Sequence, residues 1–278
     1  MIIVNVNRQY DNIGIENDAF LALGLEYRQK SCKNAYEVTE FARDANIVLF
    51  SSAKFDRAQL EELPNLKLLV RYGVGYDNVD LSAAKELEVI VCNSPSYGSY
   101  DIASHAFSLL MAANSKIPQY DRNIKSGLFG KCADYRTYRL DEKILGLVGF
   151  GRIARNMAIF SHGFGMKTIA CDPLFETGKE YDDTLIVSLD ELLTISDYVS
   201  IHAPLNNSTY HMISEHELSL MKRESVIINT ARGALIDEEA LLSALQKKSI
   251  RAAGIDVYEN YPREKDNPFH KLDNIIMT

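Results

Sequence analysis

The sequence predicts an α/β protein built on parallel sheets, and three observations support this fold class. Short strand-like runs alternate with amphipathic helical stretches through the first third of the chain. Near the middle, the glycine turn Gly149-Phe150-Gly151 separates an apolar run from a helical pattern. The alternation then resumes and continues to the end of the printed sequence. Such an order is typical of βαβ units, in which neighbouring strands run parallel.

In the first third, the expected strands are β-branched or leucine-rich runs, and the expected helices carry apolar residues at three- and four-residue spacing. The strands are 2–6, 47–50, 66–70 and 89–92, and the helices are 36–45, 57–63 and 81–87. The loop at 71–80 stands out because Gly73 and Gly75 flank one residue just beyond a strand. Its backbone N–H groups are suited to a small carboxylate, and an ordinary tight turn is the alternative.

At Ser99 the pattern changes to a long helix with one apolar face that reaches residue 113. A second helix begins near Pro118 and ends at Lys125-Ser126-Gly127. We therefore expect two domains, at 1–98 and 99–278. Farther along, Ser188 and Ser214 each precede a glutamate by three residues, which is the capping-box signature of a helix start.

The stretch 143–154, KILGLVGFGRIA, has the order strand, glycine turn, helix that dinucleotide-binding proteins share. Gly149 permits the tight turn, and Gly151 lets the backbone approach a pyrophosphate. Arg152 and Ile153 open a helix whose unpaired N–H groups face that anion. Asp172 ends the next strand, 166–171, where a carboxylate can bind the ribose hydroxyls. No arginine follows it to hold a 2′-phosphate, so NAD is favoured over NADP. An ordinary strand-to-helix turn is the alternative.

Polar residues follow three further expected strands, 198–202, 226–229 and 252–258, whose carboxyl ends should share one sheet edge. Arg232 is suited to grip a carboxylate and a carbonyl, and pairing with Asp237 or Glu238 is the alternative. Asp256 lies in the apolar run AAGIDVY, so we expect it to be buried against a partner such as a nicotinamide carboxamide, or as a satisfied core residue. His202, followed by Ala203-Pro204, is expected to line the coenzyme site rather than to catalyse.

Composition excludes several classes of function. The net charge of −8 argues against nucleic acid or an anionic membrane as the main partner. No apolar run resembles a signal peptide or a membrane span, so we expect a cytoplasmic protein. The cysteines are scattered, and we expect buried thiols with neither a metal site nor a disulfide. They are Cys32, Cys92, Cys132 and Cys171.

The chain resembles the D-isomer-specific 2-hydroxyacid dehydrogenases, the NAD-dependent family that includes D-lactate and D-3-phosphoglycerate dehydrogenases. The resemblance runs nearly end to end through RYGVGYDNVD, CNSPSYGSYDIASHAFSLL, GLVGFGRIA, ACDP, VSIHAPLNNSTYHMI, VIINTARGALIDEEAL and AAGIDVYENYP. It implies a flavodoxin-like substrate domain and a Rossmann-type coenzyme domain with a doubly wound parallel sheet. It also implies a homodimer formed through the coenzyme domain.

The resemblance further implies a role for individual residues. Val74 and Gly75 would offer backbone N–H groups to the substrate carboxylate. Arg232 would bind a 2-oxo acid and polarise its carbonyl during hydride transfer from NADH, and Asp256 would contact the nicotinamide. The remaining coenzyme contacts would come from His202, Ala203, Pro204, Thr209, Thr230, Ala231 and Arg232.

The sequence departs from the family pattern at the general acid. Tyr261 stands where the family has its catalytic Glu, with Glu259 and Glu264 nearby as replacements. The family's Pro-His pair would follow Thr278, where the printed sequence ends. We expect either a piece of a longer chain, lacking the C-terminal return segment of its first domain, or a protein that does not use the standard acid. A catalytically impaired NAD(H)-binding regulatory or scaffold protein is the alternative function.

Overall fold

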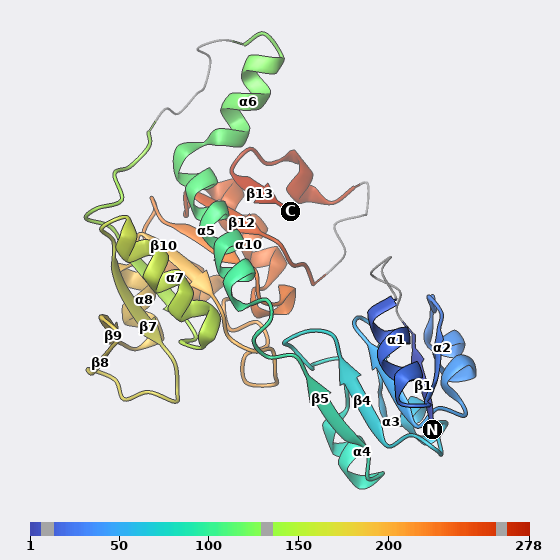
Figure 1. The fold of residues 1–278 in the computed structure, drawn as a ribbon. Coiled ribbons are helices and arrows are strands. Elements are labelled where there is room, and N and C mark those ends of the chain that lie inside the picture. Colours follow the sequence, from blue (N-terminus) through green and yellow to red (C-terminus); the bar gives the residue numbers. More distant parts are fainter. Residues whose placement is uncertain (7–13, 129–135, 260–265) are drawn as a thin grey trace. The chain divides into compact units, whose positions relative to one another are not determined.

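The computed structural model describes residues 1–6, 14–128, 136–259 and 266–278 (Figure 1). The chain divides into two compact units, Met1–Gly98 and Ser99–Thr278. Each unit has its own sheet and its own hydrophobic core. None of the described helices combines the length and the apolar character needed to cross a membrane.

The first unit is built around a five-stranded parallel sheet in the order β2-β1-β3-β4-β5. This is the strand order of flavodoxin-like doubly wound sheets, as the sequence predicts. The core is apolar and includes Val4, Val48, Phe50, Phe55 and Leu69, none of which is exposed. The strands are β1 (Ile2–Asn5), β2 (Glu26–Gln29), β3 (Ile47–Phe50), β4 (Leu68–Arg71) and β5 (Ile90–Asn93).

Side chains at the helix starts set the boundaries in the first unit. Asn34, Asp56 and Asp80 each accept a hydrogen bond from a backbone N–H in the first turn of the helix that follows. Such caps satisfy N–H groups that have no partner within the helix. The helices are α1 (Gly14–Ala22), α2 (Ala35–Ala42), α3 (Arg57–Glu61) and α4 (Leu81–Glu86).

The second unit contains an eight-stranded sheet in the order β13-β12-β11-β10-β6-β7-β9-β8. All neighbours are parallel except the β8–β9 pair. Counted from β6, the order is that of a Rossmann-type sheet, again as predicted. The strands are β6 (Ile144–Val148), β7 (Lys167–Cys171), β8 (Glu180–Tyr181), β9 (Thr184–Ile186), β10 (Tyr198–Ile201), β11 (Val226–Asn229), β12 (Ala252–Ile255) and β13 (Ile275–Met277).

Helices cover both faces of this sheet (Figure 1). One core lies beneath α5 (Ser99–Ser115) and α7 (Arg152–Gly163), and the other beneath α8 (Leu189–Ile195), α9 (Glu215–Leu220) and α10 (Glu238–Lys247). Further elements are α6 (Ile117–Lys125) and the 3₁₀ turns Gly233–Leu235 and Pro268–Lys271. The helix starts predicted at Ser188 and Ser214 are confirmed, and Ser214 forms the full capping box with Glu217.

The expectation of buried thiols is wrong for Cys92, which is exposed. Cys92 lies on β5, the last strand in the order of the first sheet, where side chains alternate between exposed and half-buried positions. Cys32 and Cys171 are half-buried and, like Cys92, free. Cys132 lies outside the described residues.

Candidate functional site

The second sheet reverses its winding direction between β6 and β10, the position at which ligands bind in open α/β sheets. Gly149 follows β6 and His202 follows β10. Gly149 has φ +92°, and a Cβ atom built on it would lie 2.9 Å from both the carbonyl carbon and the carbonyl oxygen of His202. Its N–H donates to the carbonyl of Cys171 at 2.8 Å. A residue with a side chain would therefore be strained here and would also collide with the neighbouring strand end.

Gly151 is the N-cap of α7, and no side chain caps that helix. A Cβ atom added at Gly151 would meet nothing within 4 Å, so the space in front of the helix start is open. Arg152, the first helical residue, is exposed, Ile153 is half-buried, and Ala154 is fully buried against the sheet. The N–H groups of the first turn thus face a space that an anion can enter, which fits the pyrophosphate of a dinucleotide.

Asp172 follows β7 and is half-buried beside the glycine turn. One carboxylate oxygen accepts a hydrogen bond from the N–H of Phe150 at 2.8 Å, and the other accepts from the N–H of Leu174 at 2.9 Å. The carboxylate therefore holds the glycine turn and the following loop in register. It also places a fixed negative charge next to the turn, where it can accept hydrogen bonds from ribose hydroxyls.

His202 is poorly suited to proton transfer. Desolvation by the surrounding protein lowers its pKa to about 3, so the ring is neutral at physiological pH. Nε2 lies 2.9 Å from the hydroxyl of Ser200, whereas Nδ1 is buried with no hydrogen-bond partner among the described residues. This environment agrees with a lining role. Ala203 is 8% exposed and lies beside it.

Thr209 closes the loop that follows His202. Its hydroxyl donates to the carbonyl of Pro204 at 2.6 Å and accepts from the N–H of Asn206 at 2.9 Å. Pro204 itself is exposed. Thr209 thus fixes the conformation of the loop after His202 through hydrogen bonds within that loop.

Beyond β11, the turn that carries Arg232 is held by Asn229, for which no role was expected from the sequence. Asn229 is 1% exposed, its amide donates to the carbonyl of Arg232 at 2.8 Å, and its oxygen accepts from the N–H of Ala231 at 3.0 Å. Thr230 is also buried, and its hydroxyl has no hydrogen-bond partner within the described part of the chain. A buried Asn at a strand end was the signal that could have identified this clamp.

Arg232 is half-buried, and its backbone is extended. Its guanidinium donates to the carbonyl of Ala231 at 2.7 Å. Asp237 and Glu238, the alternative partners expected from the sequence, also contact other residues. Asp237 caps α10 by accepting from Glu239 and Ala240, and Glu238 accepts from the N–H of Glu259 at 2.8 Å. The next residue, Gly233, allows a close backbone approach, since a Cβ there would lie 2.0 Å from the carbonyl carbon of Tyr258.

The expected burial of Asp256 is wrong. β12 ends at Ile255, so Asp256 is the first residue past the strand, and its side chain is 39% exposed. It accepts a hydrogen bond from the hydroxyl of Thr278 at 2.8 Å and lies 3.4 Å from Nε2 of His105 on α5. His105 also lies 2.9 Å from the Thr278 hydroxyl. These two partners were not expected from the sequence.

Of the positions expected to supply or replace the general acid's partner, only Glu259 lies within the described residues. Glu259 accepts hydrogen bonds from the hydroxyl of Tyr210 and from His211, each at 2.8 Å. Its carboxylate is therefore engaged within its own unit. Tyr261 and Glu264 lie outside the described residues. Within the described ranges, no group of three His, Cys, Asp or Glu side chains is placed to hold a metal ion.

In the first unit, the loop after β4 carries Val74 and Gly75, both half-buried. The carbonyl of Val74 accepts a hydrogen bond from the amide of Asn93 at 2.7 Å, which ties the loop to the end of β5. A Cβ on Gly73 would lie 1.7 Å from a guanidinium nitrogen of Arg71. The Arg71 cation therefore lies against the loop that was expected to bind a carboxylate. The position of Arg71 at the end of the predicted strand could have indicated this from the sequence.

Residues 107–278 match the family described as D-isomer specific 2-hydroxyacid dehydrogenase, NAD binding domain. A glyoxylate reductase of Thermococcus litoralis is 39% identical over 246 residues, which cover 84% of this chain and 72% of that protein. A D-3-phosphoglycerate dehydrogenase of Methanocaldococcus jannaschii is 38% identical over 245 residues, or 87% of this chain. The chain spans only 46% of that longer relative.

Solved structures are similar to this chain over its whole length. An acyclic imino acid reductase in complex with NADPH and D-Arg has a TM-score of 0.91 at 31% identity, covering 100% of this chain and 89% of that one. D-lactate dehydrogenase from Aquifex aeolicus, complexed with NAD and lactic acid, has a TM-score of 0.86 at 27% identity, covering 100% and 87%.

Proposed function

Because this chain belongs to the family of D-isomer specific 2-hydroxyacid dehydrogenases, we propose that it transfers a hydride between NADH and a 2-oxo acid, forming a D-2-hydroxy acid. One observation carries the proposal. Arg232 follows β11 at the same carboxyl edge of the sheet as the glycine turn and Asp172, so a substrate-binding cation and the coenzyme determinants share one edge.

The coenzyme would be held by the open start of α7 and by Asp172. Gly151 leaves room for the pyrophosphate, and the Asp172 carboxylate would accept hydrogen bonds from the adenosine ribose. A 2′-phosphate at that ribose would be repelled by the same carboxylate, which favours NADH over NADPH. When bound, the reduced nicotinamide supplies a hydride, and with it two electrons, to the substrate carbonyl carbon. Asp256, exposed past β12, remains the residue proposed to contact the nicotinamide.

Arg232 would bind the substrate carboxylate and the carbonyl oxygen together. A guanidinium presents paired N–H groups in a fixed plane, so it orients the carbonyl and stabilises the negative charge that develops on its oxygen. The Asn229 clamp supports this role by fixing the backbone on both sides of the side chain. On the first unit, Val74 and Gly75 would offer their N–H groups to the carboxylate.

The reduced oxygen must also receive a proton. His202 does not supply it, since its pKa of about 3 leaves the ring unprotonated at physiological pH. By position in the motif, Tyr261 replaces the family glutamate, and its role stays a prediction from the sequence.

The substrate class follows from the relatives. Proteins similar to this chain are named glyoxylate reductase, hydroxypyruvate reductase and D-3-phosphoglycerate dehydrogenase, so a small 2-oxo acid is the proposed substrate. The chain covers 72% of the glyoxylate reductase and 46% of the D-3-phosphoglycerate dehydrogenase. The substrates of the shorter reductases are therefore the better basis for the proposed substrate.

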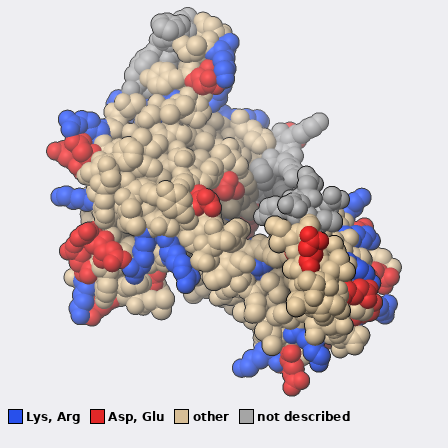
Figure 2. Space-filling view, in the orientation of Figure 1, with Lys and Arg blue, Asp and Glu red and all other residues tan. Residues whose placement is uncertain are grey.

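A homodimer is proposed through α5 and α7. Tyr100 and Ile159 are each 64% exposed and Phe164 is 49% exposed, although all three are large and apolar. Tyr100 packs edge-on against Phe160, and Phe107 packs against both Phe160 and Phe164, which makes the patch continuous. The part of this face formed by α5 and α7 is mostly free of charged side chains (Figure 2). Such patches are typical of protein–protein interfaces.

The test is NADH oxidation by the full printed chain against glyoxylate, hydroxypyruvate, pyruvate and 3-phosphohydroxypyruvate. Arg232→Ala should lower turnover by at least about 10²-fold, because one charge-stabilising group is lost, and NADH affinity should fall by much less. Arg43→Ala is the matched control, since Arg43 is exposed in the first unit and pairs only weakly with Glu40 at 3.4 Å. Tight NADH binding without turnover of any 2-oxo acid would contradict the proposed reaction.

A further inference from the structure

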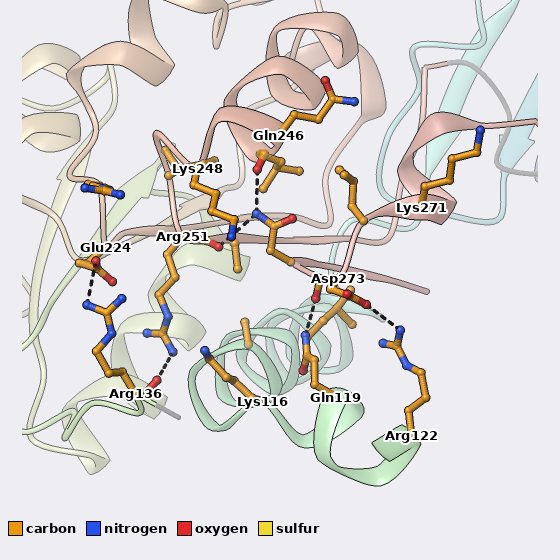
Figure 3. Close-up of a pocket in the computed structure, with 18 of the residues that line it drawn as sticks. Lys116, Gln119, Arg122, Arg136, Glu224, Gln246, Lys248, Arg251, Lys271 and Asp273 are labelled. Carbon is orange, nitrogen blue, oxygen red and sulfur yellow. Dashed lines mark hydrogen bonds and ion pairs between the residues drawn. The ribbon is translucent and has the colours of Figure 1, made fainter. Parts of the chain in front are cut away.

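Charged side chains line a cavity of about 580 Å³ at the amino ends of β11, β12 and β13 (Figure 3). Several of them pair with one another, since Arg122 lies 3.0 Å from Asp273 and Arg136 lies 3.4 Å from Glu224. These ion pairs join the starts of β13 and β11 to other parts of the unit, so a structural role accounts for them. A second polar network lies at the opposite, carboxyl ends of the same strands, where the coenzyme determinants are.

The first residue past each of five neighbouring strands lies at the same register position. The last residues of β6, β10, β11, β12 and β13 pair with one another across the sheet, so the residues that follow them form a row along its carboxyl edge. Side chains two residues earlier, such as Leu147 and Ile228, pack into the core beneath α5 and α7. Because side chains alternate between the two faces of a sheet, this places the row on the face that α5 and α7 cover. The row consists of Gly149, His202, Thr230, Asp256 and Thr278.

His105 reaches the end of this row from α5. Its Nε2 lies 2.9 Å from the hydroxyl of Thr278 and 3.4 Å from Oδ1 of Asp256. The Thr278 hydroxyl donates to the same oxygen, Oδ1, at 2.8 Å. The backbone of Thr278 is held as well, because its N–H donates to the carbonyl of Ile255 at 3.1 Å and its carbonyl lies 3.3 Å from the hydroxyl of Tyr258. Three side chains from α5 and from the ends of β12 and β13 thus form one network.

The donors and acceptors of this network have one consistent order. An ionised carboxylate only accepts hydrogen bonds, and a threonine hydroxyl has a single proton to donate. Thr278 donates that proton to Asp256, so its oxygen accepts the hydrogen bond from Nε2 of His105, which must carry a proton. His105 therefore orients the hydroxyl of Thr278, and Thr278 holds one oxygen of the Asp256 carboxylate.

The Asp256 carboxylate is held but still accessible. Its side chain is 39% exposed, and both contacts go to Oδ1, which leaves Oδ2 as the acceptor for a further donor. We propose that His105 is a positioning residue of the coenzyme site. Through Thr278 it fixes the Asp256 carboxylate so that Oδ2 accepts a hydrogen bond from the carboxamide of the nicotinamide. This role rests on the proposed contact between Asp256 and the nicotinamide.

A fixed carboxylate binds the carboxamide more tightly than a mobile one. An aspartate side chain without partners occupies several rotamers, and ordering it when the coenzyme binds costs free energy. Loss of the His105 donor should release this order and weaken the contact with the nicotinamide. The adenosine half of the coenzyme should be unaffected, because its proposed determinants, Gly151 and Asp172, follow β6 and β7.

The experiment compares binding of NADH with binding of ADP-ribose, which lacks the nicotinamide, by calorimetry on the full printed chain. His105→Phe keeps a ring but removes the donor. It should weaken NADH binding about fivefold to tenfold while the affinity for ADP-ribose changes less than about twofold. His105→Gln keeps an N–H donor and should retain most of the NADH affinity. His216→Phe is the matched control, since His216 is exposed on α9, which covers the other face of the sheet.

A double-mutant cycle tests whether His105 acts through Asp256. In an Asp256→Ala background, His105→Phe should change NADH affinity less than about twofold. Unchanged NADH affinity in His105→Phe alone, an equal loss for ADP-ribose, the same loss in His105→Gln, or full additivity with Asp256→Ala would overturn the proposal. Turnover is a separate outcome. A chain that shows the expected loss for NADH only, yet reduces no 2-oxo acid, would contradict the proposed reaction and support the role of His105.

Discussion

Gly149 and the carbonyl group of His202 approach so closely that a Cβ on the glycine would lie 2.9 Å from the carbonyl carbon. Gly149 also has φ +92°, which disfavours any side chain. We predict that Gly149→Ala lowers the free energy of unfolding by about 1–3 kcal/mol and weakens NADH binding, because the turn must move away from β10. Urea unfolding and NADH fluorescence titration measure the two effects.

Gly151→Ala makes the same chemical change at the second glycine of the turn. Its φ is −80°, and its Cβ would meet nothing within 4 Å, so stability should change little. The new methyl group would nevertheless occupy the space proposed for the pyrophosphate, so NADH affinity should fall at least about tenfold. Unchanged NADH affinity in a folded Gly151→Ala protein would show that the coenzyme does not approach this helix start.

Asp172 governs the proposed choice between NADH and NADPH. Asp172→Asn removes the charge that would repel a 2′-phosphate, and it also removes one of the two acceptors that hold Phe150 and Leu174. We expect the NADH dissociation constant to rise about tenfold while that of NADPH rises less. The preference for NADH over NADPH, measured as the ratio of the two dissociation constants, should therefore become smaller. Glu180→Gln, an exposed carboxylate on β8, controls for the loss of one charge. Equal losses for both coenzymes would mean that Asp172 acts only on the loop.

Much of the fold could be predicted because local signals and burial agree. β11 was predicted with its observed bounds from the apolar run Val226–Asn229, which is fully buried between neighbouring parallel strands. The helix start at Ser214 was predicted from its capping box, a signal that depends on two residues only, Ser214 and Glu217. Central strands and capped helices can therefore be predicted from their own residues alone.

Elements at the margins could not be predicted in the same way. β2 (Glu26–Gln29) is an edge strand without a fully buried residue. Its composition is polar, so it lacks the apolar pattern by which a strand is predicted. Asp256 was expected inside a strand because its neighbours are apolar, yet β12 stops one residue earlier. Its contact with His105 joins residues far apart in sequence and depends on how α5 lies against the sheet. Periodicity carries no information on such contacts.

His202 makes stability depend on pH in a defined direction. The folded-state pKa is about 3, below the ordinary value of 6.5, so between these values the unfolded chain binds a proton that the folded chain does not. His202 therefore lowers stability as the pH falls from 6.5 toward 3 and contributes no pH dependence above that range. His202→Gln should flatten the melting temperature against pH within this window, as measured by circular dichroism. An unchanged acid slope in the variant would show that the ring is protonated in the folded protein.

The apolar patch on α5 and α7 predicts where a charge would break the proposed dimer. Ile159 is 64% exposed at the patch, and burying an aspartate against the partner would leave an unpaired charge at the interface. Ile159→Asp should therefore convert the dimer into a monomer in sedimentation velocity while the monomer stays folded, since the side chain already faces solvent. Ile15→Asp on α1 is the matched control, because Ile15 is 74% exposed but belongs to the first unit. A dimer that survives Ile159→Asp, or a parent chain that is monomeric at micromolar concentration, would exclude this face as the interface.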